Sequence, residues 1–469
     1  MGNYYLAVDI GASSGRHILG HLEDGKMVME EIHRFENGMK DRDGELCWDV
    51  EKLFAEIKAG MKKCRELGKI PSSMGIDTWA VDYALLDEND QLLGNTVGYR
   101  DSRTEGMDLK VYESIPEEEL YERTGIQKQM FNTIYQLEAV KCRHPEYLER
   151  AQSMLLIPDY FHFLLTGRKA VEYTNASTTQ LVSPRTKDWD WELIERLGFP
   201  KRIFGKIQKP GTVLGALKKE VEVEVGFSCQ VVLPATHDTG SAVVAVPSNS
   251  KDTLYISSGT WSLMGVERME ADCSPESRRL NFTNEGGYDY RFRYLKNIMG
   301  LWMIQSLRRE VNNAYSFAQL CDMAEKESIA SLVDCNDARF MAPASMIEAV
   351  QGFCRESGQQ VPQTVGELAC VIYHSLAACY RKTALELEER TGVHYDGLHI
   401  VGGGTNADYL NRLTAMATGK TVYAGPAEAT AIGNLAVQMI QEGELADLTA
   451  ARSCIYASEK IKVFCDGTK

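Results

Sequence analysis

The chain has 469 residues, a formal net charge of −15, and hydrophobic and charged fractions of 44% and 25%. This length predicts two large domains, and the acidic balance disfavours a broad binding surface for nucleic acid or anionic lipid. No stretch has the length of a membrane span, and the first residues lack the pattern of a signal peptide. The 12 cysteines contain no CxxC pair, so we expect reduced thiols, no structural zinc and a cytoplasmic location.

The first predicted elements form a hairpin with a tip of small residues. Apolar segments at 4–10 and 17–20 flank Gly-Ala-Ser-Ser-Gly-Arg at 11–16, the pattern of strand, turn and strand. Backbone N–H groups and Ser hydroxyls at such a tip can approach phosphate oxygens, and Arg16 can neutralise their charge. Asp9, at the end of the first strand, can hold a metal ion through water. A purely structural hairpin is the alternative interpretation.

A helix and further strands follow the hairpin. Asp49 precedes apolar residues at helical spacing as far as Leu67, which predicts a helix capped by Asp49. Residues 74–86 predict two strands, and residues 116–199 are mainly helical.

Aromatic and charged residues gather near the predicted strand ends at 75–83 and 99–103. Sugars are usually bound in this way, with polar groups hydrogen-bonded to charges and apolar faces stacked on rings. The alternatives are burial of Trp79 in the core and a structural ion pair between Arg103 and Asp101.

An apolar run at 230–234 predicts a buried strand that leads to His237, Asp238 and Thr239, where a helix begins. A hydroxyl that attacks a phosphoryl group needs a carboxylate to take its proton, and Asp238 is suitably placed for that role. The alternatives are a helix N-cap for Asp238 and a core histidine for His237.

The second half of the chain opens as the first does. Residues 252–265 again read as apolar strand, small-residue turn and apolar strand, which is a weak internal repeat. We therefore place a domain boundary near 242–252, and expect a long helix at 366–390 and a strand at 398–401.

Glycines at 402–404 follow that strand and precede a helix. They fit GxGxxA nominally, but the next predicted strand runs into Ala-Gly-Pro at 424–426 instead of the acidic residue that a dinucleotide fold requires. We interpret them as a place where the backbone lies against an adenine or ribose. A Walker A sequence is absent. A dinucleotide oxidoreductase and a non-catalytic ATP-binding module stay open as alternatives.

These segments, in this order, resemble the FGGY carbohydrate kinases from Tyr5 to about Glu442. The most specific stretches are AVDIGASSGR (7–16), GIDTWAVDYALLD (75–87), YRDSRT (99–104), THDTGSAV (236–243), YISSGTWSLMG (255–265) and HIVGGG (399–404).

The resemblance implies an α/β fold with two ribonuclease H-like domains of the actin and sugar-kinase superfamily, which flank a catalytic cleft. Residues 1–245 would carry the sugar site and the first phosphate loop, and residues 246–469 the nucleotide site. The implied ligands are ATP, Mg²⁺ and a ketose. L-rhamnulose is the expected substrate, and L-fuculose and L-xylulose are alternatives. We expect a monomer or small homo-oligomer that binds neither nucleic acid nor membrane.

The same resemblance assigns roles to individual residues. The residues implied to bind nucleotide are Ala12, Ser13, Ser14, Gly15, Arg16, Thr260, Gln305 and Gly403. Those implied to bind the ketose are Ala80, His237, Asp238, Thr239 and Asn297, with Asp238 as proton acceptor and Asp9 at the metal. Ala80 departs from the family pattern because relatives carry Gly there, and its methyl group can narrow the sugar pocket.

Overall fold

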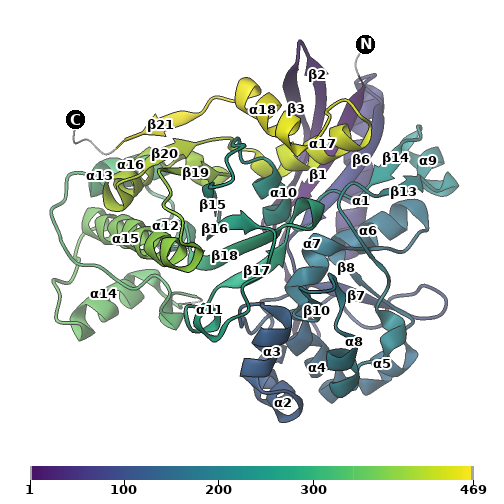
Figure 1. The fold of residues 1–469 in the computed structure, drawn as a ribbon, viewed down its shortest axis with the longest axis horizontal. Helices are drawn as coiled ribbons and strands as arrows, with labels where there is room; N and C mark the ends of the chain where they lie inside the picture. Colours follow the sequence, from purple (N-terminus) through teal and green to yellow (C-terminus); the bar gives the residue numbers. More distant parts are fainter. Residues whose placement is uncertain (1–2, 342, 466–469) are drawn as a thin grey trace. The chain divides into compact units, whose positions relative to one another are not determined.

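The computed structural model describes residues 3–341 and 343–465 (Figure 1). The chain forms two compact units. The first contains the residues up to Ala245, Glu267–Tyr294 and Thr430–Ser458, and the second contains Val246–Val266, Leu295–Ala429 and the residues from Glu459 on. The assignment of sugar binding to 1–245 and of nucleotide binding to 246–469 stays a prediction.

A six-stranded sheet forms the centre of the first unit, in the order β13-β14-β6-β1-β2-β3. Its strands are β1 (Tyr4–Ile10), β2 (Ser14–Glu23), β3 (Lys26–Glu36), β6 (Pro71–Thr78), β13 (Val213–Ala216) and β14 (Gln230–Val232). The pairing of β1 with β2 is antiparallel, which confirms the predicted hairpin, whereas β1, β6 and β14 run parallel. The carboxyl ends of these three parallel strands therefore lie at one edge of the sheet.

The first unit also contains the helices and short strands given next. The helices are α1 (Val50–Glu66), α2 (Met107–Ser114), α3 (Glu117–Thr124), α4 (Thr133–Arg143), α5 (Pro145–Arg150), α6 (Ile157–Thr166), α7 (Tyr173–Ala176), α8 (Trp191–Arg196), α9 (Lys219–Val225), α10 (Asp238–Val244), α11 (Pro275–Arg279), α17 (Ala429–Gln441) and α18 (Leu448–Ser458). The side chain of Asp49 accepts a hydrogen bond from the backbone of Lys52, so the predicted cap of α1 is confirmed. The short strands of this unit are β4 (Lys40–Arg42), β5 (Glu45–Cys47), β9 (Val171–Glu172), β10 (Val182–Ser183), β11 (Asp188–Trp189) and β12 (Ile207–Gln208).

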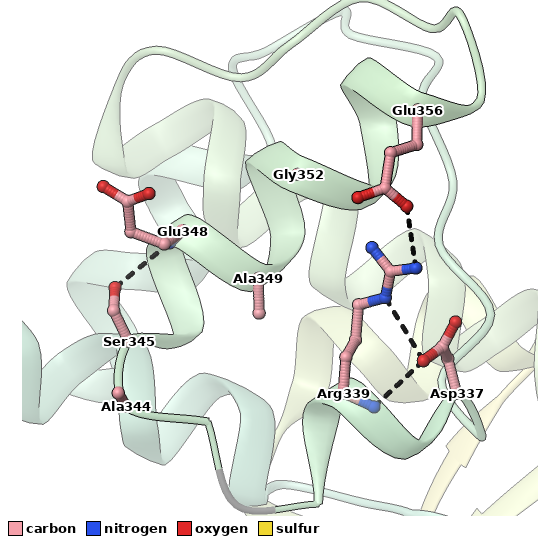
Figure 2. Close-up of a pocket in the computed structure, with 8 residues that line it drawn as sticks. All are labelled: Asp337, Arg339, Ala344, Ser345, Glu348, Ala349, Gly352 and Glu356. Carbon is pink, nitrogen blue, oxygen red and sulfur yellow. Dashed lines mark hydrogen bonds and ion pairs between the residues drawn. The ribbon is translucent and has the colours of Figure 1, made fainter.

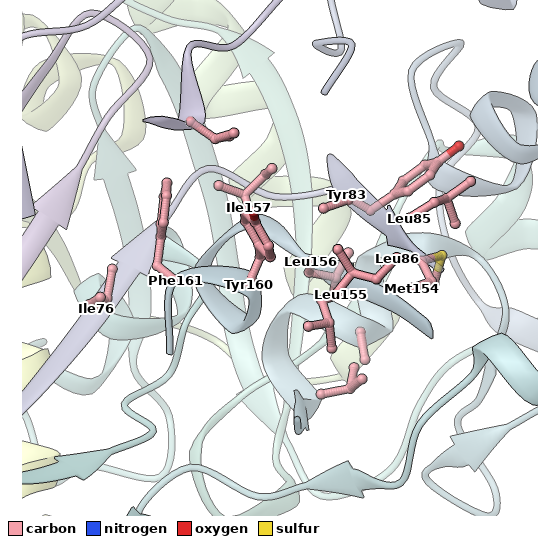
Figure 3. Close-up of a cluster of buried hydrophobic side chains, with 14 of the residues drawn as sticks. Ile76, Tyr83, Leu85, Leu86, Met154, Leu155, Leu156, Ile157, Tyr160 and Phe161 are labelled. Carbon is pink, nitrogen blue, oxygen red and sulfur yellow. The ribbon is translucent and has the colours of Figure 1, made fainter. Parts of the chain in front are cut away.

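The core of the first unit is continuous around β7 (Tyr83–Leu86), β8 (Ser153–Leu156) and α6. Strands β7 and β8 pair antiparallel, and Figure 3 shows their side chains beside those of α6. Leu86, Leu156 and Phe161 are fully buried. Each such side chain stabilises the fold by about 1.5–3 kcal/mol through the apolar surface it buries. This packing holds the loop between β6 and β7, which carries Ala80, on a rigid base.

The second unit repeats the plan of the first. Its strands β15 (Leu254–Ser258), β16 (Trp261–Arg268), β19 (Gly397–Val401), β20 (Thr421–Ala424) and β21 (Lys462–Phe464) follow the order β16-β15-β19-β20-β21. As with β1, strand β15 pairs antiparallel with the next strand and parallel with a later one. The predicted internal repeat is therefore confirmed as a repeat of strand topology.

Helices of the second unit are α12 (Trp302–Glu310), α13 (Phe317–Ala324), α14 (Met346–Glu356), α15 (Val365–Thr391) and α16 (Asp408–Thr418). Strands β17 (Thr283–Gly286) and β18 (Phe292–Met299) lie in the segment where the chain passes from the first unit to the second. Over the described residues, no helix has the length and apolar character needed to cross a membrane. All 12 cysteines are described and are free.

Candidate active site

Three carboxylates lie where the parallel strands of the first unit end. Asp9 and Asp77 are register partners on β1 and β6, and Thr78 forms a bridge with His237 just before Asp238. The backbone N–H of Thr78 donates to the carbonyl of Thr236 at 2.9 Å, which extends the sheet toward α10. The topology therefore brings Asp9, Asp77 and Asp238 to one edge, as expected for a ligand site in a parallel sheet.

Asp9 is engaged by Arg16 across the first hairpin. Its Oδ2 accepts hydrogen bonds from Nε of Arg16 at 3.0 Å and from Nη2 at 2.7 Å. Only residues 11–13 form the turn, because Ser14, Gly15 and Arg16 already belong to β2. Gly15 also has a packing reason to be glycine, because a Cβ there would lie 2.1 Å from the ring of Phe35.

Asp77 is a fully buried carboxylate. Its Oδ2 accepts a hydrogen bond from Nδ2 of Asn434 on α17 at 2.6 Å, while its Oδ1 has no hydrogen-bond partner among the described residues. Burial first, and then the charge of Asp9, raise the pKa of Asp77 well above its usual value. No role was predicted for Asp77 from the sequence, although it lies within the segment 75–87.

Asp238 is the first residue of α10, and His237 is the N-cap. The N-cap interpretation of Asp238 is therefore wrong. Its Oδ1 accepts hydrogen bonds from the backbone N–H of Thr239 at 2.5 Å and from Oγ1 of Thr239 at 3.2 Å. The side chain keeps 33% of its surface exposed, so a substrate can reach it. Burial first, and then the charge of Asp9, raise the pKa of Asp238 to about 7.

Buried hydrogen bonds fix the backbone that leads to Asp238. Glu172 accepts from the backbone N–H of Thr236 at 3.0 Å, from Oγ1 of Thr236 at 2.7 Å and from the backbone N–H of Thr174 at 2.8 Å. The backbone N–H of His237 donates to Oγ1 of Thr174 at 3.2 Å. Because the partners of a buried carboxylate are costly to remove, this arrangement holds the start of α10 in one position.

A second polar group lies beside Ala80. Oδ2 of Asp82 accepts hydrogen bonds from the indole N–H groups of Trp48 at 2.6 Å and Trp79 at 2.9 Å, and the two indole rings lie 3.9 Å apart. Burial raises the pKa of Asp82 to about 6. Trp79 is 6% exposed, so the core interpretation of this residue is confirmed.

The backbone next to Ala80 is strained. Val81 has a φ of 68°, which a β-branched residue rarely adopts. Its carbonyl accepts a hydrogen bond from Oγ1 of Thr133 at 2.6 Å.

The guanidinium of Arg103 donates to Oε1 of Gln136 at 2.7 Å, while Asp101 accepts from the backbone N–H of Arg103. The proposed side-chain pair of Arg103 with Asp101 is therefore wrong.

In the second unit, the turn between β15 and β16, the start of α12 and the turn after β19 lie close together. The backbone N–H of Trp302 donates to the carbonyl of Thr260 at 3.0 Å, which joins the turn between β15 and β16 to the start of α12. A Cβ on Gly402 would lie 2.9 Å from the carbonyl oxygen of Ser258, so the turn after β19 contacts the end of β15. Thr260, Gln305 and Gly403 lie on these three elements, and Asn297 lies on β18 in the same unit.

A hollow elsewhere in the second unit contains none of these residues. It has a volume of about 530 Å³ and is lined by residues of α14, by Ala344 and Ser345 just before it, and by Asp337 and Arg339 (Figure 2). Arg339 donates to Oε2 of Glu356 at 2.9 Å, and its Nε lies 3.2 Å from Oδ1 of Asp337. Asp337, Arg339 and Glu356 in this hollow therefore already have partners.

Two further groups near Asp238 were missed by the sequence analysis. Arg293 and Glu285 are buried beside His237. Arg293 could have been noticed because a charged residue interrupts an apolar strand, Phe-Arg-Tyr-Leu at 292–295. Asn434 and Gln438 could have been noticed in the same way, because they are polar residues four positions apart in the apolar helix α17.

Each unit contains a sheet of the same strand topology, and the sheet of the first unit carries three carboxylates at its strand ends, as in kinases of the two-domain sugar-kinase class. Residues 4–245 match the N-terminal domain of the FGGY family of carbohydrate kinases, and residues 254–442 match its C-terminal domain. The chain belongs to this family, whose members transfer a phosphoryl group from ATP to an alcohol group of a sugar.

Among curated proteins, the chain is 54% identical to a rhamnulokinase of Halalkalibacterium halodurans, with 98% of each chain covered. It is 44% identical to a rhamnulokinase of Bacillus subtilis, over 98% of this chain and 95% of the relative. Among solved structures, a xylulose kinase from Lactobacillus acidophilus matches with a TM-score of 0.82 at 17% identity, over 99% of this chain and 94% of that one. Plasmodium falciparum glycerol kinase with ADP matches with a TM-score of 0.78 at 14% identity, with the same coverage. These structures support the shared fold.

Proposed function

We propose that the chain phosphorylates L-rhamnulose with ATP to give L-rhamnulose 1-phosphate, and that Asp238 is the general base. The observation that carries the role of Asp238 is its carboxylate at the strand ends, partly exposed, with a pKa raised to about 7. A base titrating near neutral pH combines a populated carboxylate with enough basicity to take a hydroxyl proton. The choice of sugar follows the relatives named rhamnulokinase, at 41–54% identity.

The proposed reaction is a direct in-line transfer. The O1 hydroxyl of the ketose loses its proton to Asp238 as it attacks the terminal phosphorus of ATP, and the bond from that phosphorus to the bridging oxygen breaks so that ADP leaves. Ala12, Ser13, Ser14, Gly15 and Arg16 stabilise the phosphate charge, with the guanidinium of Arg16 as the cationic partner. Thr239 holds Asp238 in place through two hydrogen bonds.

The donor set at the strand ends suits Mg²⁺. The part of the chain that the structure describes contains no cluster of three or more His, Cys, Asp or Glu side chains arranged as a metal site. Mg²⁺ is commonly held by one or two carboxylates together with water and phosphate oxygens, and Asp9 at this edge offers such a carboxylate. Asp9 would hold the ion, which when bound neutralises charge on the phosphate oxygens.

In the second unit, the nucleotide would bind where the turn between β15 and β16, the start of α12 and the turn after β19 lie close together. Thr260, Gln305 and Gly403 lie on the elements that meet there. A Cβ on Gly403 would have only the carbonyl of Ser258, 4.0 Å away, as a neighbour within contact distance, so a flat adenine or ribose can approach this backbone.

His237, Thr239 and Ala80 would contact the ketose in the first unit, and Asn297 from the second. Ala80 is partly exposed and sits beside the strained Val81, so its methyl group would shape the pocket for the sugar. We also propose a cytoplasmic protein that acts as a monomer or small homo-oligomer, which light scattering at working concentrations would establish.

The test is ADP release measured in parallel with L-rhamnulose, L-fuculose and L-xylulose. We expect the highest kcat/KM for L-rhamnulose. A higher value for either other ketose would overturn the substrate assignment, and ADP release that does not depend on any sugar would overturn the kinase reaction.

A further inference from the structure

The ring of His237 is held by a buried arginine. Nη2 of Arg293 lies 2.9 Å from Nδ1 of His237. A guanidinium group has only donors, so Nδ1 of His237 must be the acceptor in this contact. A neutral imidazole has one protonated nitrogen, and its hydrogen is therefore on Nε2.

Arg293 has little freedom to leave this position. Its side chain is fully buried, its Nε donates to the carbonyl of Gly286 at 2.9 Å, and its Nη2 lies 3.1 Å from Oε2 of Glu285. Glu285 and Gly286 lie on β17 and Arg293 lies on β18, and all three residues belong to the first unit. A buried ion pair of this kind is weak evidence for stability, so a positioning role is a better reason for its presence.

The other tautomer of His237 conflicts with this geometry. Oε2 of Glu285 lies 3.5 Å from Nδ1 and would favour a hydrogen there, but Nη2 of Arg293 is closer to the same nitrogen. A hydrogen on Nδ1 would point two donors at each other. Burial first, and then the charge of Arg293, lower the pKa of His237 well below its usual value, which keeps the ring neutral.

The opposite side of the ring faces the proposed base. Nε2 of His237 lies 3.4 Å from Oδ1 of Asp238. Thr239 donates two hydrogen bonds to the same Oδ1. Every hydrogen bond that Asp238 accepts from the described residues goes to Oδ1, so Oδ2 is the oxygen left to receive a proton from the substrate.

We propose that Arg293 is a positioning residue that fixes His237 as the neutral tautomer with its hydrogen on Nε2. The ring then offers a donor toward Oδ1 of Asp238 and toward the sugar, and cannot itself accept the proton. This inference rests on the proposed role of Asp238 and adds which of its oxygens acts.

The direct test is ¹⁵N NMR of the full-length protein with labelled histidine and no ligand. The His237 signals are assigned by their loss in His237→Gln. We expect an unprotonated Nδ1 and a protonated Nε2 at neutral pH. A hydrogen on Nδ1, or a charged ring, would overturn the proposal from the wild-type spectrum alone, whether or not the variants fold.

The paired variant Arg293→Met with Glu285→Gln removes the guanidinium without leaving an unpaired buried carboxylate. We expect a mixture of tautomers in this variant and the wild-type tautomer in Arg293→Lys, which can still donate. The matched control, Arg279→Met with Glu276→Gln, removes an exposed pair and should leave His237 unchanged. An unchanged ring in the folded paired variant would contradict the proposal.

Kinetics separate positioning from a structural effect. We expect the paired variant to lower kcat about tenfold with little change in KM for ATP. In a His237→Gln background, where an amide replaces the ring and has no tautomer to fix, the same two changes should lower kcat less than about twofold. Equal losses in both backgrounds would point to a structural role. If Asp238→Asn retains activity, the general-base assignment fails while the NMR result stands.

Discussion

Asp9 and Arg16 face each other across the first hairpin, with Oδ2 of Asp9 accepting two hydrogen bonds from one guanidinium group. The two residues are register partners on β1 and β2, so the hairpin itself sets their distance. The pair joins the proposed metal ligand to the proposed phosphate contact. Loading of MgATP should therefore depend on the planar fork of Arg16 as well as on its charge.

Arg16→Lys tests this dependence. A lysine keeps the charge but cannot donate to Oδ2 of Asp9 from two nitrogens of one planar group, so we expect kcat/KM for ATP to fall about tenfold or more. ADP release at saturating sugar measures it. Arg34→Lys, at an exposed pair with Glu31, is the matched control and should have wild-type kinetics. Wild-type kinetics in Arg16→Lys would show that charge alone suffices.

The pH dependence of sugar phosphorylation should follow Asp238. Its pKa is raised to about 7, so the proton-accepting carboxylate is lost as the pH falls through about 7. We expect kcat/KM for the sugar to rise about tenfold per pH unit below about pH 7 and to level off above it. A profile that stays flat between about pH 5 and about pH 8 would contradict this assignment.

Asp77 should make the fold less stable as the pH rises. Burial and the charge of Asp9 raise its pKa, so the folded chain holds a proton that the unfolded chain has already lost above about pH 4. Asp77→Asn removes this loss, and we expect a higher free energy of unfolding than wild type at about pH 8.

Denaturant unfolding at about pH 5 and at about pH 8 measures this effect, with Asp24→Asn in an exposed turn as control. The advantage of Asp77→Asn should shrink toward the lower pH. An advantage that is equal at both values, or absent at about pH 8, would contradict the expected titration.

Gly403 and Gly404 should respond differently to alanine. A Cβ on Gly404 would lie 2.0 Å from Oγ of Ser258, whereas a Cβ on Gly403 has no neighbour closer than 4.0 Å. We expect Gly404→Ala to destabilise the fold by about 1–3 kcal/mol, and Gly403→Ala to fold normally with weaker ATP binding. Thermal unfolding and nucleotide titration separate the two effects. Failure of Ser258→Gly to restore stability to Gly404→Ala would rule out this collision.

Local patterns predicted much of the fold. The apolar spacing after Asp49 and the small-residue turns between apolar strands gave the capped helix α1 and both hairpins, because these features depend on neighbours in sequence. The resemblance of whole segments named the family. Local reasoning left Asp238 open between a helix cap and a general base, and the resemblance to the family assigned it the role of proton acceptor.

The sequence could not predict contacts made across long separations. Asn434 contacts Asp77 from a helix 357 positions away along the chain, and Arg293 contacts His237 from 56 positions away. Such pairs depend on the tertiary fold, and no local period or turn marks them. The same reason explains why Arg103 was paired with its neighbour Asp101 when its guanidinium in fact bonds Gln136.

The role of Asp238 is tested most directly by a rapid-quench measurement of one turnover, with saturating MgATP and L-rhamnulose, on wild type and Asp238→Asn. Loss of the proton acceptor should slow phosphoryl transfer by about 10²- to 10⁴-fold, with unchanged ATP affinity, while Asp24→Asn keeps the wild-type rate. Transfer by Asp238→Asn within a few-fold of wild type would contradict the general-base role.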